Sequence, residues 1–240
     1  QRRFEPRDEA PLTTDAFVAR FDAAGVASYV TYAGGNSNDT PTAIALDDNG
    51  IAWITGTTES ADFPTVGARQ PNFGDGLVFS SADGGGTWTA AAGGVGHRDV
   101  LAVAVHPIDP AVIYAGTFGG GVFKTTDGGR TWAAMNSGLA TLFVQALVVD
   151  PANPSRVFAG TDGGSVFKSV DGGANWTLSL GPATLPVTTL AIAPSNPSIM
   201  YAGAAARVFG RVFTSVDGGE TWNAGAATDG LQRLLQIVSA

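Results

Sequence analysis

Residues 124–132 read KTTDGGRTW, and the same pattern returns three more times along the chain. Asp127 and the two glycines after it mark a turn, because a carboxylate accepts hydrogen bonds from turn amides and glycine adopts positive φ. Trp132 follows within the same motif, and its side chain has a large apolar area that favours burial. The motif therefore predicts a tight turn that joins two antiparallel strands and pins the second strand by its tryptophan.

The four copies recur at nearly constant spacing and end at Trp88, Trp132, Trp176 and Trp222. The intervals are 44, 44 and 46 residues, and a period of this size is typical of a propeller or a solenoid. Residues 142–180 contain four short apolar or alternating segments, LFVQALVVD, RVFAGT, SVFKSV and WTLSL, separated by turn residues. No segment has a helical period. We predict an all-β fold, a β-propeller of four-stranded antiparallel blades, whose strands we label A to D from the inside outward.

The repeated motif resembles the Asp-box, or BNR, repeat over residues 76–230. The positions that carry the resemblance are Ser81, Asp83, Gly85, Trp88, Thr125, Asp127, Gly129, Trp132, Ser169, Asp171, Gly173, Trp176, Ser215, Asp217, Gly219 and Trp222. The third copy departs mildly, with Asn175 where the pattern has threonine. The resemblance implies the propeller fold and says little of function, since the family includes sialidases, xyloglucan-cleaving glycosidases, sortilin-type receptors and photosystem II assembly-factor propellers.

The N-terminal part is similar to another repeat, the bacterial β-propeller repeat called SBBP, over residues 15–75. The stretch DAFVARFDAAG begins at Asp15, and DGLVFSSADGG begins at the equivalent position, Asp75. One blade therefore starts as an SBBP repeat and ends as an Asp-box repeat. The DDNG sequence at 47–50 indicates a hairpin turn, since the further ligands of a calcium loop are missing.

Counting strands in register gives five blades. Residues 16–33 read as strands C and D, complete blades follow at about 41–92, 99–135, 142–180 and 187–224, and residues 234–239 read as one more strand A. We predict that Phe17–Asp22 and Leu234–Ser239 share a blade, within a single propeller domain at 15–240 preceded by an extension at 1–14. Strand B of the shared blade is missing, so the alternative is that the ring is completed by another segment or chain.

Composition narrows the classes of partner. The chain of 240 residues carries a net charge of −8, which argues against a nucleic acid or an anionic membrane surface as partner. It contains no cysteine, so disulfides, thiolate metal sites and a cysteine nucleophile are excluded. No apolar run is long enough to span a membrane.

Candidate catalytic residues are few. His106 lies in an A–B turn at the repeat position of Asp150, and His97 has no second histidine near it in the sequence, so we expect no metal site and no cofactor. A sialidase would need an Arg-Ile-Pro segment and a spare tyrosine, and the chain offers neither. A glycosidase pair could come only from the carboxylates outside the repeat, Glu59, Asp62 and Asp99. We therefore predict that the protein is not an enzyme, with a glycoside hydrolase as the alternative.

Loops that break a repeat are the natural places for binding. The D–A and B–C loops share one face of a propeller, and here they include the irregular stretches 57–75, 93–99, 204–210 and 230–233. The candidate binding residues on this face are Phe63, Arg69, Phe73, His97, Arg98, Arg207, Phe209 and Arg233. Aromatic side chains together with arginine suit a protein partner and also suit the stacking of sugars.

These patterns predict a non-enzymatic propeller that acts as a protein-interaction or scaffold module. The repeat resemblances imply a bacterial protein that is secreted, periplasmic or attached to the cell surface. Two alternatives stay open, a glycan-binding or glycoside-hydrolase propeller and an accessory or assembly subunit of a larger complex.

Overall fold

The computed structural model describes the chain in ten parts, residues 13–21, 24–47, 50–60, 63, 77–83, 87–91, 95, 99–183, 185–205 and 209–229. Within these parts every regular element is a β-strand, which confirms the all-β prediction. The same parts contain no helix with the length and apolarity needed to cross a membrane.

The described strands form one two-stranded and four four-stranded antiparallel sheets. A hairpin of β1 (Ala16–Phe21) and β2 (Ala27–Ala33) comes first. The first complete blade consists of β3 (Asp39–Leu46), β4 (Ala52–Thr58), β5 (Leu77–Ser81) and β6 (Thr89–Ala90). The next consists of β7 (Val100–Val105), β8 (Ile113–Thr117), β9 (Gly121–Thr125) and β10 (Ala133–Ala134).

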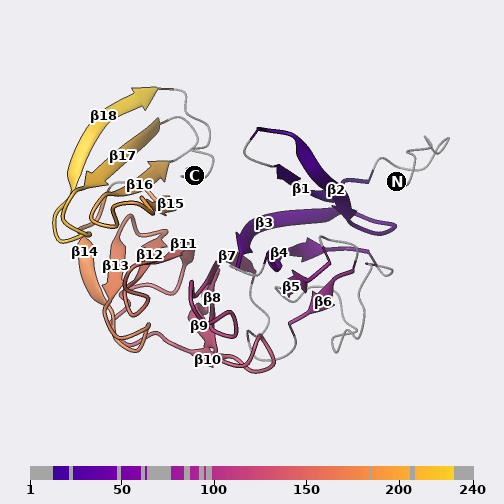
Figure 1. Cartoon of the computed structure of the whole chain (residues 1–240). Helices are drawn as coiled ribbons and strands as arrows, with labels where there is room; N and C mark the ends of the chain where they lie inside the picture. Colours follow the sequence, from indigo (N-terminus) through magenta and orange to yellow (C-terminus); the bar gives the residue numbers. More distant parts are fainter. Residues whose placement is uncertain are drawn as a thin grey trace.

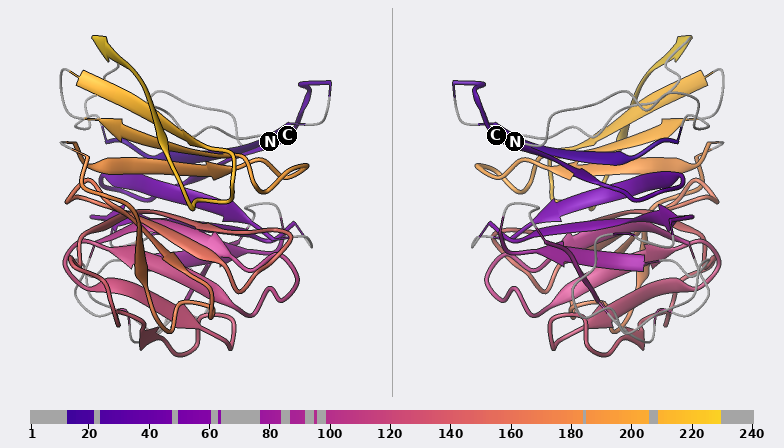
Figure 2. Two further views of the ribbon diagram at one scale, coloured as in Figure 1. Left: turned by 90° about the vertical axis from the view of Figure 1, so that its left-hand side faces the viewer. Right: turned by 90° about the vertical axis from the view of Figure 1, so that its right-hand side faces the viewer.

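Two more blades follow, in the positions that the repeat predicted. One contains β11 (Val144–Val149), β12 (Val157–Thr161), β13 (Val166–Ser169) and β14 (Thr177–Leu180). The other contains β15 (Val187–Ile192), β16 (Met200–Ala205), β17 (Phe209–Ser215) and β18 (Asn223–Asp229). The sheets fan around a common centre, with β3, β7, β11 and β15 on the inside, and the β1–β2 hairpin and the β15–β18 blade stand at the two ends of the fan (Figure 1). Figure 2 shows from the side that each sheet is twisted along its length.

The apolar core lies between neighbouring blades. Val144 and Val187 begin the inner strands of their blades and are fully buried. Each meets a glycine of the preceding blade, because a Cβ on Gly116 or Gly160 would lie 2.7 Å from the valine Cγ1. The glycine of the repeated AG pair in strand B is therefore the residue that lets adjacent blades approach closely.

Strand D differs in length from blade to blade. β6 and β10 have two residues each, whereas β18 has seven and pairs with a long β17 up to Phe209 opposite Asp229. Within the described residues, each of these outer strands pairs with the strand C of its own blade. Residues 234–239 lie outside the described part of the chain, so their sharing of a blade with β1 stays a prediction.

Candidate functional site

The four turns at 81–88, 125–132, 169–176 and 215–222, here called the DGG turns, hold their aspartates in one arrangement. In the second turn the Thr125 hydroxyl donates to Asp127 Oδ1 at 2.7 Å, and the Thr131 amide donates to the same oxygen at 2.9 Å. The Thr131 hydroxyl donates to Asp127 Oδ2 at 2.6 Å, and the Gly129 amide donates to Thr125 Oγ1 at 3.0 Å. The prediction that the carboxylate organises the turn is confirmed in this geometry.

The third turn shows why the substitution at Asn175 is mild. The Asn175 side-chain amide donates to Asp171 Oδ2 at 2.8 Å, in the place of the threonine hydroxyl, and its backbone amide donates to Oδ1 at 2.9 Å. The backbone donor of the other turns is thus kept, and the side-chain amide replaces the threonine hydroxyl as the second donor. Gly85 of the first turn lies outside the described residues.

These hydrogen bonds favour the ionised carboxylates. Those from Thr131 lower the pKa of Asp127 to about 2, and those from Asn175 lower the pKa of Asp171 to about 2. Hydrogen bonds from Thr87 lower the pKa of Asp83 to about 2, and the pKa of Asp217 is lowered in the same manner. A carboxylate that is fully ionised at neutral pH holds no proton to donate, so these aspartates are unsuited to act as general acids.

We expect Asp127→Ala to lower the melting temperature by a few degrees, because three donors of the turn lose their acceptor. Asp127→Asn keeps one carbonyl acceptor and should lose less. Thermal unfolding followed by circular dichroism measures both variants. A melting temperature unchanged in Asp127→Ala, together with loss of ligand binding, would contradict the structural role.

Acid should weaken the fold over a defined range of pH. Because the folded-state pKa values lie below the ordinary aspartate value of 3.8, the turns contribute stability that is fully present above pH 4 or so. That stability is lost as the pH falls from about 4 to about 2 and the carboxylates are protonated. Urea unfolding at a series of pH values should show a shallower slope for Asp127→Asn than for the unchanged chain; equal slopes would reject the linkage.

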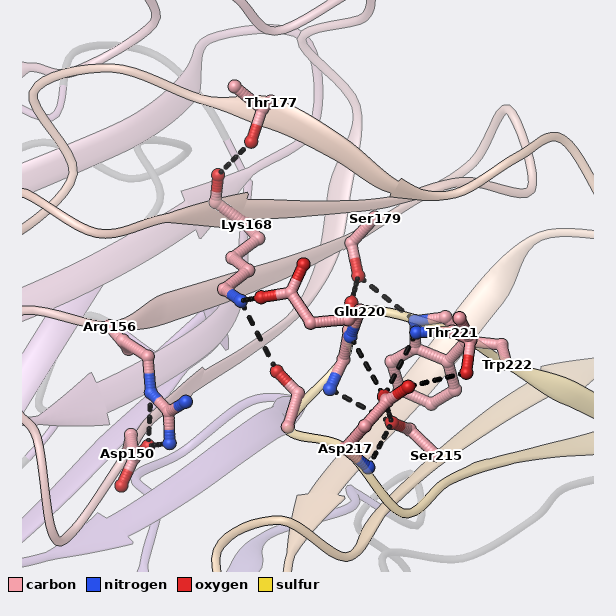
Figure 3. Close-up of polar contacts among 12 residues, drawn as sticks. Asp150, Arg156, Lys168, Thr177, Ser179, Ser215, Asp217, Glu220, Thr221 and Trp222 are labelled. Carbon is pink, nitrogen blue, oxygen red and sulfur yellow. Dashed lines mark hydrogen bonds and ion pairs between the residues drawn. The ribbon is translucent and has the colours of Figure 1, made fainter.

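Lysines on strand C connect the third and fourth DGG turns to the preceding blade. Lys124 Nζ donates to the Gly172 carbonyl at 2.9 Å, and the Tyr114 hydroxyl donates to the same carbonyl at 3.1 Å. One blade further on, Lys168 forms an ion pair with Glu220 beside the fourth turn (Figure 3). Burial raises the pKa of Tyr114 to about 12 and lowers the pKa of Lys124. Both groups lie at the contact between adjacent blades and bind the same carbonyl.

The tryptophans pack at the same joints. Trp176 is 3% exposed, and its Nε1 donates to the Met135 carbonyl at 2.8 Å. Trp222 Nε1 donates to Ser179 Oγ at 2.9 Å, as Figure 3 shows. Trp88 and Trp132 are different, since their buried Nε1 atoms have no hydrogen-bond partner among the described residues. All four tryptophans thus pack between blades. In two of the four copies, at Trp176 and Trp222, the indole N–H group also donates a hydrogen bond.

Most of the predicted binding face lies outside the described residues. This applies to Arg69, Phe73, His97, Arg98, Arg207 and Arg233, whose role stays a prediction. Phe209 is the first residue of β17. Phe63 packs against the core, with its ring centroid 4.8 Å from that of Phe79. The structure therefore assigns Phe63 to the support of the β3–β6 blade.

The remaining candidates for chemistry have local partners. His106 Nδ1 accepts hydrogen bonds from the amides of Ile108 and Asp109, at 3.3 and 3.0 Å. Asp150 Oδ1 holds the equivalent turn by the same pattern of bonds, so His106 replaces a turn-forming aspartate. Glu59 accepts a bond from the Asn38 side chain at 3.0 Å, and Asp62 lies outside the described residues. Within the described ranges no three His, Cys, Asp or Glu side chains gather as a metal site would need.

An exposed aromatic pair stands on the face of the D–A and B–C loops. Phe118 follows β8 and is 51% exposed, and Phe143 precedes β11 and is 36% exposed. Their ring centroids are 4.7 Å apart in an edge-to-face arrangement, and Leu142 beside them is also exposed. We call Phe118, Leu142 and Phe143 the Phe118 surface.

Backbone hydrogen bonds fix this surface in place. The Phe118 amide donates to the Asp99 carbonyl at 2.9 Å, and the amides of Gly119 and Gly121 donate to the Leu142 carbonyl at 2.9 and 2.8 Å. The two loops therefore form one rigid support that spans two blades.

The sequence held a signal for the Phe118 surface that loop length did not reveal. Phe118 occupies the repeat position of Asp162, and Phe143 occupies the repeat position of Asp99. At both places the loop has the same length as in the other copy, and only the type of residue differs. A position-by-position comparison of the copies, with attention to apolar residues at polar positions, could have found it.

Comparisons with known proteins agree with this architecture. A family model described as SBBP, "Beta-propeller repeat", matches residues 28–64, which confirms the SBBP resemblance over a shorter stretch than predicted. The "Regulatory protein FlaEY" of Caulobacter vibrioides is 36% identical over 80 residues, which are 32% of this chain and 8% of that protein. The match thus spans less than a tenth of that relative.

Solved structures resemble the whole fan of blades. A chain in the crystal structure of a nidogen/laminin complex has a TM-score of 0.66 at 11% identity, over 95% of this chain and 80% of that chain. A chain in the crystal structure of a mitotic checkpoint complex has a TM-score of 0.56 at 12% identity, over 90% of this chain and 60% of that chain. At such identities the likeness establishes the fold alone, which is the β-propeller.

Proposed function

We propose that this protein is a non-enzymatic β-propeller module that binds another protein through the face of its D–A and B–C loops. The observation that carries the proposal is the Phe118 surface, where two phenylalanines and a leucine are exposed side by side. Exposed aromatic groups held on a rigid support are the usual centre of a protein interface. Because backbone bonds already fix the loops, little conformational freedom is lost on binding.

Three further points belong to the proposal. The DGG turns are Asp boxes, supported by the recurrent hydrogen bonds around the four aspartates. The similar chains in the nidogen/laminin and checkpoint structures come from protein complexes, which supports a protein partner here. The protein acts outside the cytoplasm of a bacterium, which rests on the SBBP match and on a relative from Caulobacter vibrioides.

The test uses the native protein together with its bound partners. Phe118→Ser combined with Phe143→Ser should release the partner and leave the melting temperature nearly unchanged, since both side chains are exposed. Leu178→Ser is the matched control, because Leu178 is 56% exposed on β14, away from this face. Binding is measured by co-purification and then with the identified partner by calorimetry.

Two outcomes would overturn the proposal. One is retention of the partner by the double variant at full strength. The other is binding of a soluble polysaccharide, with loss of that binding in the double variant, which would establish the glycan-binding alternative. Hydrolysis of the polysaccharide would establish the glycoside-hydrolase alternative.

A further inference from the structure

We propose that a pocket beside Asp39 binds the primary ammonium group of a lysine side chain on the protein partner. Residues of the β1–β2 hairpin, β3, β4 and β5 line this pocket. That the lysine belongs to the partner rests on the function proposed above, whereas the affinity of the pocket for an ammonium group can be tested without the partner.

The first support is a buried carboxylate oxygen that lacks a donor. Asp39 is only 3% exposed. Its Oδ2 accepts hydrogen bonds from the Ser60 hydroxyl at 2.8 Å and from the Gly35 amide at 2.9 Å. Its Oδ1 is buried as well and has no hydrogen-bond partner among the described residues. Because a buried oxygen in this state is costly, the site favours a ligand that donates to it, and a cationic donor most of all.

The second support is the size and lining of the pocket. Asp39 borders a cavity of about 20 Å³, which has room for one group of the size of a water molecule or an ammonium group. The planar guanidinium group of arginine is larger. The methylene groups of a lysine side chain can pack on apolar residues while its charged end reaches an acceptor. The apolar residues that line the pocket are Ala16, Ala33, Pro41, Ile54, Phe63 and Phe79.

The same lining suits a metal ion poorly. A calcium ion takes about 6–8 oxygen ligands, whereas Asp39 is the one acidic residue among the described residues that line the pocket. Two of the hydroxyl oxygens there already have partners: Thr55 Oγ1 lies 2.8 Å from Thr42 Oγ1, and Thr58 Oγ1 accepts from the Ser60 amide at 3.0 Å. An ammonium group needs a single carboxylate and brings its own apolar stem, so it suits this lining better.

The third support is the position of the pocket in the fold. Asp39 is the first residue of β3 and lies opposite Thr58, the last residue of β4. Phe143 likewise precedes an inner strand, β11, and Phe118 likewise follows a second strand, β8. The pocket therefore lies at the same end of the blades as the Phe118 surface, where one partner can contact both.

The first experiment titrates methylammonium chloride into the 240-residue protein and follows the methyl NMR signals of Ala16, Ala33 and Ile54. We expect saturable shifts with methylammonium and none with tetramethylammonium at the same ionic strength, because the larger cation does not fit the cavity. Asp39→Asn should weaken binding about tenfold or more, since a hydrogen bond between charged groups is lost. Asp162→Asn is the matched control, because it removes the same charge from an exposed residue at the same end of the blades.

Ala16→Val provides a second variant that leaves the carboxylate in place. The larger side chain should fill the cavity and abolish the methylammonium shifts. Equal binding by Asp39→Asn and the unchanged protein would overturn the proposal, as would the absence of shifts with methylammonium, which would leave water as the occupant. Equal shifts with sodium or potassium chloride would also overturn it, in favour of a metal ion.

The second experiment measures the affinity for the co-purified partner by calorimetry. Asp39→Asn should weaken it about tenfold, and Asp162→Asn should not. If methylammonium binds but Asp39→Asn keeps full affinity for the partner, the assignment to a partner lysine is overturned while the proposed function stands. Retention of the partner by the Phe118 and Phe143 double variant overturns the proposed function instead.

Discussion

Replacing Trp176 by alanine is expected to lower the free energy of unfolding by about 3–5 kcal/mol, the usual range for removing a buried aromatic side chain. The indole is 3% exposed and belongs to the core cluster between the β7–β10 and β11–β14 blades. Its loss opens a cavity and also leaves the Met135 carbonyl without its donor. Urea unfolding at neutral pH measures the change.

Trp176→Phe divides this effect into its two parts. Phenylalanine keeps much of the packing and lacks the N–H group, so this variant should lose about 0.5–1.5 kcal/mol through the hydrogen bond and somewhat more through the smaller ring. A loss below 1 kcal/mol or so for Trp176→Ala would show that the blades do not depend on this side chain.

Gly138→Ala is expected to be nearly as damaging, although it adds only a methyl group. Gly138 has a φ of +90°, and a Cβ there would lie 2.1 Å from the Trp176 carbonyl oxygen. The left-handed backbone costs about 1–2 kcal/mol and the forced shift about 1–3 kcal/mol more, so we expect a loss of about 2–5 kcal/mol.

The control for Gly138 is Gly181→Ala. A Cβ on Gly181 would meet no atom within 4 Å, and this residue has no positive φ. The control should therefore unfold at nearly the same urea concentration as the unchanged protein. Equal midpoints for both glycine variants would mean that the loop around Gly138 moves away from Trp176 at little cost.

The fold could be predicted because its determinants are local and repeated. Each DGG turn carries its own acceptor, its own donors and its own tryptophan, so the spacing of the copies sets the spacing of the blades. The effect of Asn175 could be anticipated as well, since an amide can replace a hydroxyl as donor to Asp171. The close approach of blades at Gly116 and Gly160 was visible only as a repeated AG pair, and its meaning required the position of the facing valine.

The candidate site was much harder to predict, because it depends on which loops meet. Phe118 and Phe143 are far apart in the sequence and come together only when two blades pack side by side. Phe63 was assigned to a binding face because it lies in an irregular loop, but tertiary packing places it against Phe79. The sequence pattern also did not reveal that one side of β1 is exposed. Phe17 and Phe21 occupy alternating positions, as apolar residues do in a strand that is covered by a neighbour.

The sheet made of β3, β4, β5 and β6 has a consequence for how such chains evolve. Its first two strands belong to the stretch that matches the SBBP model, at 28–64, while β6 follows the first DGG turn. The SBBP match therefore ends between two strands of one sheet, and β4 meets β5 there in regular register. Because strands pair through backbone groups, we expect the β3–β4 hairpin to be exchangeable for another hairpin of the same register with the sheet retained. The unit of exchange would then be a hairpin of two strands rather than a whole blade.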